Sequence, residues 1–169
     1  MKARGFTLTE ILVALAIVAT LAGIAVPVTR SLVGRSREAA CLNQLRGLGV
    51  GLEGYLQEHQ QKLPELEAGR ETKSSDAPVL ETVLLPYVGG PGSFRCPQDR
   101  ELFEKSGSSY LWNSTQSGLH FASLSFFGNT DRPDKIPLIT DKEAWHPSGT
   151  NFLYADQSSS TKVRFAAAN

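Results

Sequence analysis

The sequence predicts an α+β protein, in which a long N-terminal helix spans a membrane and then packs on a small antiparallel β-sheet. Residues 11–28 carry no charge and, with residues 6–9, are long enough to cross a bilayer, since a spanning helix needs about 20 mostly apolar residues. After residue 92, short β-branched or aromatic segments alternate with turn residues, a pattern typical of an antiparallel sheet. The chain also has 15 glycines and 9 prolines, which favours a loop-rich domain over a helix bundle.

Glu10 is an ionisable residue near the start of this apolar run. A charge within a membrane helix costs about 2.5–3.5 kcal/mol at the bilayer centre and less toward its ends, so it usually has a partner or a task. The natural partner is a positive charge. The nearest candidate is a free amino group made by cutting the chain before Phe6.

The segment from Gly5 to Glu10 follows a short basic leader and precedes the apolar run. This arrangement resembles the processing site of type IV pilins and type II secretion pseudopilins. The resemblance implies that a membrane-embedded prepilin peptidase cuts after Gly5 and methylates the new N-terminal Phe6. It also implies that Glu10 pairs with the N-terminus of a neighbouring subunit in a filament. The expected division is a leader (1–5), a transmembrane and assembly helix (6–29) and a soluble pilin-like domain (30–169).

Two other interpretations of the N-terminal segment compete with this one. A secretory signal peptide also has a basic start, an apolar core and a small-residue cut site, and both Thr20-Leu21-Ala22 and Gly23-Ile24-Ala25 fit such a site. Its apolar core is usually about 7–15 residues long, however, and rarely contains a glutamate. A plain membrane anchor leaves Glu10 unexplained.

The charges that flank the apolar run leave its orientation undecided. Lys2 and Arg4 precede it and should stay cytoplasmic, but Arg30, Arg35 and Arg37 follow it and nearly balance them. The resemblance decides the topology. It implies a single-pass protein of the inner membrane with its C-terminal domain outside the cytoplasm, and a filament in the periplasm or at the cell surface.

The expected partners follow from the same resemblance. They are the prepilin peptidase, other pilin or pseudopilin subunits, the inner-membrane assembly machinery and membrane lipid. Loss of Lys2 and Arg4 from 17 basic residues leaves 15 against 17 acidic ones. No basic excess therefore indicates binding to nucleic acid.

The helix is expected to continue to about residue 62, with a bend or break at Pro27 and an end at Leu63-Pro64. Gly47, Gly51 and Gly54 share one face, and each costs roughly 0.8–1 kcal/mol of helix propensity. They predict close approach of another backbone, most simply the sheet, with a partly melted helix as the alternative. An amphipathic stripe at three- and four-residue spacing is formed by Leu42, Leu45, Leu48, Leu52, Tyr55 and Leu56.

Residues 63–92 are predicted to be a loop region with one short helix over 80–85 that ends near Pro86. The β-sheet is predicted within residues 93–169. Its strands are expected at 109–112, 121–127, 136–140, 150–155 and 162–165.

A second set of motifs covers the C-terminal half. It consists of Phe94 to Asp99, Ser109-Tyr110 with Asn113, Pro137 to Asp141, and His146 to Asp156, together with Cys41 to Arg46 nearer the N-terminus. These motifs resemble a bacterial family of pilin-like proteins that end in a histidine, nine residues and then Asp-Gly. His146 and Asp156 keep this spacing, but Gln157 replaces the glycine. Glutamine would be strained at a positive φ, so this corner is expected to be remodelled.

Asp141, His146 and Asp156 are candidate metal ligands, because imidazole and carboxylates suit several divalent ions. Calcium is the expected ion in that case, since oxygen-rich loops suit it and the resemblance includes pseudopilins with calcium sites. The favoured alternative is that His146 and Asp156 hydrogen-bond the backbone and close a hairpin over 145–151. We expect no enzyme, because the chain has no G-x-S-x-G, Walker or H-E-x-x-H motif.

Cys41 and Cys96 are the two cysteines of the chain. Outside the cytoplasm such a pair can oxidise, and the long closed loop would then stabilise the fold by roughly 4 kcal/mol. The alternative is that Cys41, near the membrane, lies too far from Cys96. The aromatic residues are expected mainly in the core, with a ligand groove as the alternative: Tyr110, Trp112, Phe121, Phe126, Phe127, Trp145, Phe152 and Tyr154.

Three functions are compatible with these observations. The first is a structural subunit of a type IV pilus or a type II secretion pseudopilus. The second is an anchored extracytoplasmic binding module that forms no filament, and the third is an anchored metal-dependent enzyme that uses Asp141, His146 and Asp156. Glu10 and the intact cleavage motif favour the first, because neither a simple anchor nor an enzyme requires them.

Overall fold

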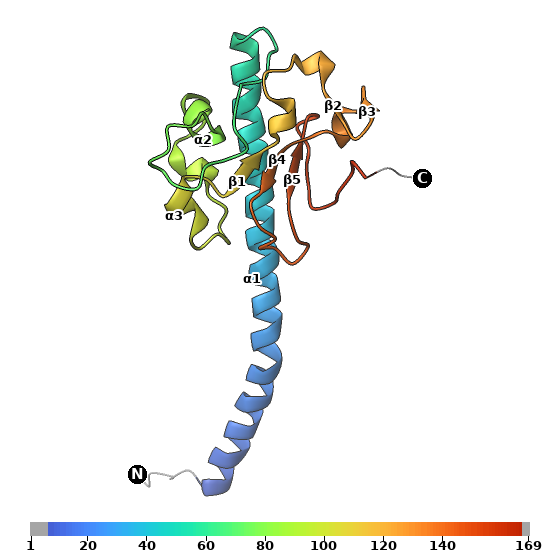
Figure 1. Ribbon diagram of the computed structural model, residues 1–169. Coiled ribbons are helices and arrows are strands. Elements are labelled where there is room, and N and C mark those ends of the chain that lie inside the picture. The colour runs from blue at the N-terminus through green and yellow to red at the C-terminus, as the bar shows by residue number, and fades with distance from the viewer. Residues whose placement is uncertain (1–6, 167–169) are drawn as a thin grey trace. The chain divides into compact units, whose positions relative to one another are not determined.

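The computed structural model describes residues 7–166 and confirms the α+β class (Figure 1). The chain forms two compact units, Met1–Ser36 and Arg37–Asn169. Helix α1 (Leu8–Glu58) contributes to both units. The units are described in turn.

In the N-terminal unit, α1 begins with a capping box. The backbone N–H and the hydroxyl of Thr7 each donate to Oε2 of Glu10 at 2.8 Å, and the N–H of Glu10 donates to Thr7 Oγ1 at 3.3 Å. This reciprocal pairing satisfies groups that an uncapped helix start would leave open. Glu10 therefore has a local structural role that was not predicted from the sequence.

The apolar side chains of this unit are exposed along the whole of residues 8–33. Leu8 is 76% exposed, Leu21 62% and Ile24 69%. Among residues 7–166, α1 is the one helix long and apolar enough to cross a membrane by length and composition. It continues through Pro27 without interruption, so a break at that position is not found.

α1 ends at Glu58, earlier than the expected residue 62. Gln60 and Gln61 have φ angles of 54° and 60°, and the N–H of Gln61 donates to the carbonyl of Leu56 at 2.9 Å. Left-handed residues of this kind terminate a helix and satisfy its last carbonyls. They are usually glycine or asparagine, which is why two glutamines gave no stop signal.

The C-terminal unit contains an antiparallel sheet in the order β1-β4-β5-β6. Its strands are β1 (Tyr110–Trp112), β4 (Pro137–Asp141), β5 (Phe152–Tyr154) and β6 (Ser159–Ser160). A separate small hairpin pairs β2 (Ser125–Phe126) with β3 (Asn129–Thr130). Figure 1 shows β4 and β5 side by side next to α1.

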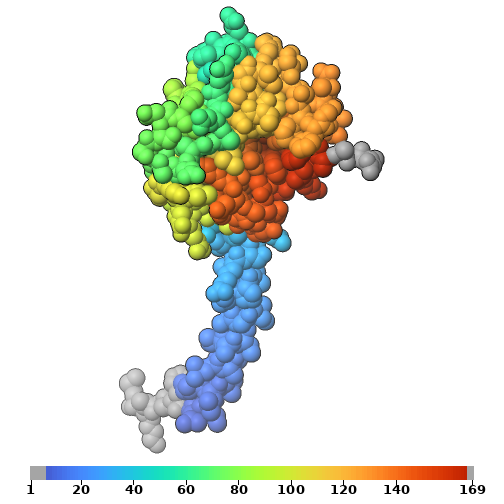
Figure 2. Space-filling model, viewed as in Figure 1, coloured from blue at the N-terminus to red at the C-terminus, as the bar shows by residue number. Residues whose placement is uncertain are grey.

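The core of this unit lies between α1 and the sheet. Leu45, Leu48 and Leu52 of α1 are fully buried, as the predicted stripe required, and they belong to one cluster with Leu138 and Leu153 of the sheet. The loop after α1 runs beside β1, where the N–H of Trp112 donates to the carbonyl of Ala68. The space-filling view shows this green loop segment against the orange-to-red C-terminal strands (Figure 2).

Short helices replace part of the expected loop and strand structure. The α-helices are α2 (Leu80–Val83) and α3 (Leu102–Ser106). Single 3₁₀ turns occur at Leu85–Tyr87, Pro91–Phe94, Ser114–Gln116, Phe121–Ser123 and Pro133–Lys135.

Two strand predictions require correction. Residues 121–127 form a 3₁₀ turn followed by the short β2, with Phe127 at a φ of 47°. Residues 162–165 are not a strand, and the edge of the sheet is β6 instead. A polar Ser-Ser segment has little strand propensity of its own, so only its pairing with β5 identifies it.

The glycines of α1 partly follow the prediction of close approach. A Cβ on Gly51 would lie 3.1 Å from the carbonyl oxygen of Tyr87, and one on Gly54 would lie 3.3 Å from the Tyr87 ring, whereas Gly47 faces open space. The approaching segment is therefore the 3₁₀ turn Leu85–Tyr87 and not the sheet. Gly49, which was not among the predicted contacts, is the glycine that faces β5, through Leu153.

A buried ion pair fixes the loop after α1. Arg70 donates to Glu81 at 2.9 Å, and their side chains are only 12% and 7% exposed. The same guanidinium donates to the carbonyls of Lys73, Ser75 and Ser106. Residues 65–78, part of the predicted loop region, are mostly exposed and are held by this largely buried cation.

Candidate functional site

The first candidate site is the N-terminal segment that carries Glu10. The Glu10 side chain is exposed, and both of its bonds to Thr7 end on Oε2. The predicted cleavage and methylation residues, Gly5 and Phe6, lie outside the residues that the structure describes. The pairing of Glu10 with another subunit's N-terminus stays a prediction, because the structure contains one chain.

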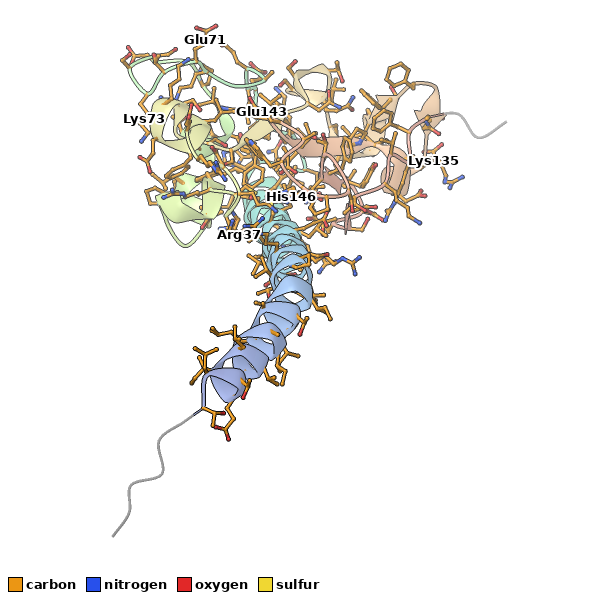
Figure 3. All side chains as sticks on the ribbon, turned by 90° about the horizontal axis from the view of Figure 1, so that it is seen from below. Arg37, Glu71, Lys73, Lys135, Glu143 and His146 are labelled. Atoms are coloured by element: carbon orange, nitrogen blue, oxygen red, sulfur yellow. The ribbon has the colours of Figure 1, made fainter. Side chains whose placement is uncertain are left out.

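The second candidate site is a buried cluster of two thiols, an imidazole and a carboxylate in the C-terminal unit. Cys41, Cys96, Asp141 and His146 are all buried, and one ligand atom from each lies within 4.8 Å of the others. We call these four residues the dithiol cluster. In the view from below, His146 lies against α1, the helix that carries Cys41 (Figure 3).

Four different segments supply the dithiol cluster. Cys41 lies on the buried stripe of α1, and Asp141 is the last residue of β4. Cys96 follows the 3₁₀ turn Pro91–Phe94, and its N–H donates to Ser109 Oγ at 2.9 Å. His146 opens a turn closed by the N–H of Gly149, which donates to the His146 carbonyl at 2.9 Å. Gly149 adopts a φ of 97°, a conformation that favours glycine.

Hydrogen bonds connect the members directly. Cys41 Sγ donates to Asp141 Oδ1 at 3.3 Å and lies 3.4 Å from the hydroxyl of Tyr110. The Nε2 atom of His146 lies 3.3 Å from Cys96 Sγ and 3.4 Å from Asp141 Oδ2. The backbone N–H of Asn151 donates to Asp141 Oδ2 at 2.8 Å. The four side chains therefore form one network.

Burial and proximity perturb the proton affinities of these groups. Burial raises the pKa of Asp141 to about 6, and the nearby Glu38 raises it further, while hydrogen bonds from Asn151 and Cys41 oppose the shift. Burial lowers the pKa of His146. The interaction between the two thiols, above all, lowers the pKa of Cys96 and raises that of Cys41. Perturbed groups gathered in one place mark a candidate functional site.

Several polar atoms around the dithiol cluster have no hydrogen-bond partner among the described residues. They include Nδ1 of His146, Oε1 of Glu38 and both amide atoms of the Asn151 side chain. Glu38 acts electrostatically on both His146 and Asp141. A buried polar group without a partner costs about 1–3 kcal/mol of stability. These atoms can therefore form further hydrogen bonds that the described residues do not supply.

The structure separates the predicted metal ligands. Asp141 and His146 come together, but Asp156 is exposed, and it accepts bonds from the N–H and hydroxyl of Ser158 at 3.0 and 2.6 Å. The prediction that His146 and Asp156 together close a hairpin over 145–151 is therefore wrong, since Asp156 bonds to Ser158 and the His146 ring lies against Cys96 and Asp141. The nine-residue interval contains the whole of β5, so His146 precedes this strand and Asp156 follows it at the other end.

The cysteines are close enough to interact, contrary to the concern that Cys41 would lie too far from Cys96. Both are buried free thiols, and the disulfide stays a prediction. Their meeting with Asp141 and His146 was missed, because the thiols and the histidine motif were considered separately. The signal was present: Cys41 lies in register with the buried stripe at Leu45 and Leu48.

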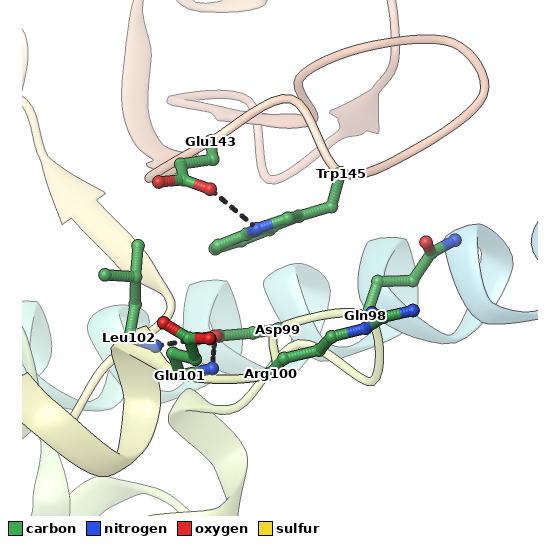
Figure 4. Close-up of a pocket in the computed structure, with 7 residues that line it drawn as sticks. All are labelled: Gln98, Asp99, Arg100, Glu101, Leu102, Glu143 and Trp145. Carbon is green, nitrogen blue, oxygen red and sulfur yellow. Dashed lines mark hydrogen bonds between the residues drawn. The ribbon is translucent and has the colours of Figure 1, made fainter.

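A polar hollow of about 410 Å³ lies between the two loops that carry Cys96 and His146. Figure 4 shows its walls, with Asp99 near the start of α3 and Trp145 across from it. Asp99 accepts the backbone N–H groups of Glu101, Leu102 and Phe103, and Trp145 Nε1 donates to Glu143 at 3.1 Å. These polar groups are therefore already paired within the wall of the hollow.

The aromatic side chains divide between core and surface. Tyr110, Trp112 and Tyr154 are buried, as expected, whereas Phe127 is 76% exposed. Phe126 and Phe152 pack edge-on against Phe165, which was not among the predicted aromatic core residues.

Comparison with known proteins identifies one match. Residues 1–26 match the family described as the prokaryotic N-terminal methylation motif. The matched stretch contains Gly5, Phe6 and Glu10 and ends within the apolar run. It supports a pilin- or pseudopilin-like protein that is processed as a prepilin, and it points to a structural protein and not to an enzyme. Neither the curated proteins nor the solved structures gave a match to the chain.

Proposed function

We propose that this protein is a filament subunit of a type IV pilus or a type II secretion pseudopilus. In this proposal prepilin peptidase removes residues 1–5 and methylates Phe6, and the inner-membrane assembly machinery inserts the mature chain into a helical filament. The observation that carries the proposal is the match of residues 1–26 to the N-terminal methylation motif, directly joined to an exposed apolar helix.

The exposed helix supports assembly with other copies of the same kind of helix. Association of helices in lipid depends on close van der Waals packing between small residues. Ala19 and Gly23 are four residues apart on α1, and a Cβ on Gly23 would meet nothing within 4 Å in the single chain. Close packing of a neighbouring subunit helix at this position accounts for the glycine.

Glu10 supports the same proposal. An exposed carboxylate in an apolar segment is costly without a partner, and Thr7 occupies only one of its two oxygens with hydrogen bonds. In the filament, the N-terminal amino group of an adjacent mature subunit supplies the compensating charge. The capping box and the intersubunit ion pair use the same carboxylate for two purposes.

The test of processing is the intact mass of the protein isolated from native membranes. The proposal requires loss of residues 1–5 and one methyl group on Phe6. An N-terminus at Gly23 or Val26 would indicate an ordinary signal peptide, and an N-terminus at Met1 would indicate an uncut anchor. Either result would overturn the proposal.

The test of assembly separates the charge of Glu10 from its capping role. Glu10→Gln keeps a side chain that suits the capping box but removes the charge, so cleavage should be normal while filament yield falls strongly. The matched control is Thr7→Ala, which removes the capping hydroxyl and keeps the carboxylate, and should assemble. Normal filament yield from Glu10→Gln would contradict the pairing, and would favour an anchored binding module.

A further inference from the structure

We propose that Cys41, Cys96, Asp141 and His146 bind a structural Zn²⁺ ion. This site goes beyond filament assembly and does not depend on it. The proposal rests on the geometry of the donor atoms, on their chemistry and on the segments that they join.

The spacing of the donor atoms fits a tetrahedral ion. Zinc bonds of about 2.0–2.3 Å place the corners of a tetrahedron about 3.3–3.8 Å apart. Two edges of the dithiol cluster have such lengths whichever oxygen of Asp141 binds the ion. One is Cys96 Sγ to His146 Nε2 at 3.3 Å, and the other is either Cys41 Sγ to Asp141 Oδ1 at 3.3 Å or His146 Nε2 to Asp141 Oδ2 at 3.4 Å. All four ligand atoms lie within 4.8 Å of one another, so small side-chain movements are enough to close the site.

The donor chemistry selects zinc over calcium. Two thiolates and an imidazole suit a borderline-soft ion, whereas calcium takes six to eight oxygen ligands. Only one of the four residues offers oxygen. Zinc binding converts both thiols to thiolates, and the two displaced protons pass to solvent.

The site is closed, which indicates a structural ion. Structural zinc has four protein ligands, whereas catalytic zinc keeps a position for water or substrate. Here all four ligands are protein side chains, and all four are buried. The ion would join the helix α1, the loop after Pro91–Phe94, the end of β4 and the turn at His146, which are distant in sequence.

The surroundings supply a carboxylate that can accept a hydrogen bond from the ligand histidine. A histidine that binds a metal through one nitrogen usually donates the other N–H to a carboxylate or carbonyl. Nδ1 of His146 and Oε1 of Glu38 are both buried without partners among the described residues, and Glu38 acts electrostatically on His146. The hollow lined by Gln98, Arg100 and Trp145 opens between the loops of two ligands.

The test begins with the full-length wild-type chain, isolated from native membranes in detergent without chelator. Elemental analysis should find about one zinc per chain, with both cysteines reduced when the protein is denatured and titrated for thiols. Replacement of zinc by Co²⁺ should produce thiolate-to-cobalt charge-transfer bands and tetrahedral d–d bands. Excess Ca²⁺ should not displace either ion.

Variants then assign the ligands. Cys96→Ser and His146→Gln should each weaken zinc binding by more than about 100-fold, since even changes to residues that only hydrogen-bond a ligand cost about 10- to 100-fold. Glu38→Gln should weaken it by about 10-fold or more. Asp156→Asn is the matched control, because Asp156 lies outside the cluster in the same C-terminal motif, and its zinc content should equal that of the wild type.

Two outcomes would overturn the proposal. The first is a wild-type chain isolated with Cys41 bonded to Cys96 and without zinc. The second is a reduced wild-type chain whose Co²⁺ spectrum lacks thiolate charge-transfer bands. Both measurements use the wild type, so a variant that fails to fold does not leave the proposal untested.

Discussion

The leucines of α1 have opposite surroundings in the two units of the chain. In the N-terminal unit Leu21 is 62% exposed and Leu32 60%, whereas in the C-terminal unit Leu45 and Leu48 are fully buried. The helix is the same, but the first stretch has no contacts to bury its apolar surface and the second stretch is covered by the sheet. An exposed apolar stretch of this length needs lipid or other helices as its surroundings, while the second stretch supports its own domain.

The acidic residues Glu10 and Glu81 show the same difference in burial between the two units. Glu10 is exposed, and its proposed ionic partner belongs to another subunit. Glu81 is buried, and its partner Arg70 belongs to the same chain. In the proposed filament, the N-terminal unit therefore uses its exposed side chains for assembly, whereas the buried side chains of the C-terminal unit stabilise its own fold.

Removal of the buried cation should give the largest effect on stability. Arg70→Ala leaves Glu81 as an unpaired buried charge and three carbonyls without their donor. Breaking a buried ion pair from one side costs about 3–5 kcal/mol. The expected loss is measured by urea unfolding of the full chain in detergent, followed by tryptophan fluorescence.

The matched control is Arg132→Ala. Arg132 pairs with Asp134 at 3.0 Å, but the side chains are 55% and 41% exposed, and exposed pairs contribute about 0–1 kcal/mol. Equal effects of the two variants would show that residues 65–78 are not held as the structure describes.

The contrast between the two stretches of α1 is tested by replacing one leucine with alanine in each stretch. Leu45→Ala should destabilise the C-terminal unit by about 2–5 kcal/mol, because it opens a cavity in the core. Leu21→Ala should leave its unfolding unchanged, because Leu21 is 62% exposed and belongs to no buried core. The measurement is urea unfolding of both variants beside filament yield.

The two variants should differ in which readout they change. Leu21→Ala is expected to lower filament yield and leave the urea midpoint unchanged, whereas the main effect of Leu45→Ala is expected to be a lower urea midpoint. A loss of stability from Leu21→Ala would mean that the two units do not divide folding and assembly in this way.

Sequence periodicity predicted the helix, its buried stripe and three of the strands, because these depend on local pattern. It did not predict the end of α1, since Gln60 and Gln61 adopt left-handed angles that glutamine rarely shows. It also missed β6, where pairing with β5 and not propensity makes Ser159 and Ser160 a strand.

Of the two candidate sites, only the N-terminal one could be predicted from the sequence, because only its pattern is local. The methylation motif is contiguous, so residues 5–10 could be recognised directly. The dithiol cluster joins residues that are as much as 105 positions apart, from Cys41 to His146, and only the tertiary packing of α1 on the sheet unites them. The spacing of the motif suggested that His146 and Asp156 lie together, but the fold places Asp156 outside the dithiol cluster.

A third prediction concerns Asp99, which organises the loop after Cys96. Its carboxylate is 4% exposed and accepts three backbone N–H groups at the start of α3, as well as the hydroxyl of Ser109 at 2.6 Å. Hydrogen bonds to a charged group contribute about 1.5–3 kcal/mol, so Asp99→Ala should destabilise the C-terminal unit by about that amount in urea unfolding.

Asp156→Ala provides the comparison, because Asp156 also caps a turn but is exposed. Its loss should cost about 0.5–1 kcal/mol. If Asp99→Ala lowered stability no more than Asp156→Ala, burial would not explain the contribution of Asp99 to stability.

The smallest expected effect is at Gln157, where the sequence departs from the glycine of the C-terminal motif. Gln157 keeps the positive φ, 66°, so the corner is not remodelled as expected, and glutamine is instead held in a left-handed conformation. That conformation costs roughly 1–2 kcal/mol for a residue with a Cβ. Glycine is also more flexible than glutamine in the unfolded chain, and the entropy that it loses on folding offsets part of this gain in stability. Gln157→Gly should therefore stabilise the C-terminal unit by about 0.5–1 kcal/mol, measured as a higher midpoint in urea.

Gly49 shows whether the gain comes from the backbone or from the side chain. A Cβ on Gly49 would collide with the Gln157 side chain and touch Leu153, so Gly49→Ala alone should destabilise the unit. Combined with Gln157→Gly, the same change should cost less, because one of the colliding groups is gone, and residues in contact give non-additive effects. Strict additivity would mean that Gln157 does not pack over α1, and the benefit of Gln157→Gly would then be purely conformational. Gln60→Gly, at an exposed position with a φ of 54° just after the end of α1, supplies the reference value for such a purely conformational gain.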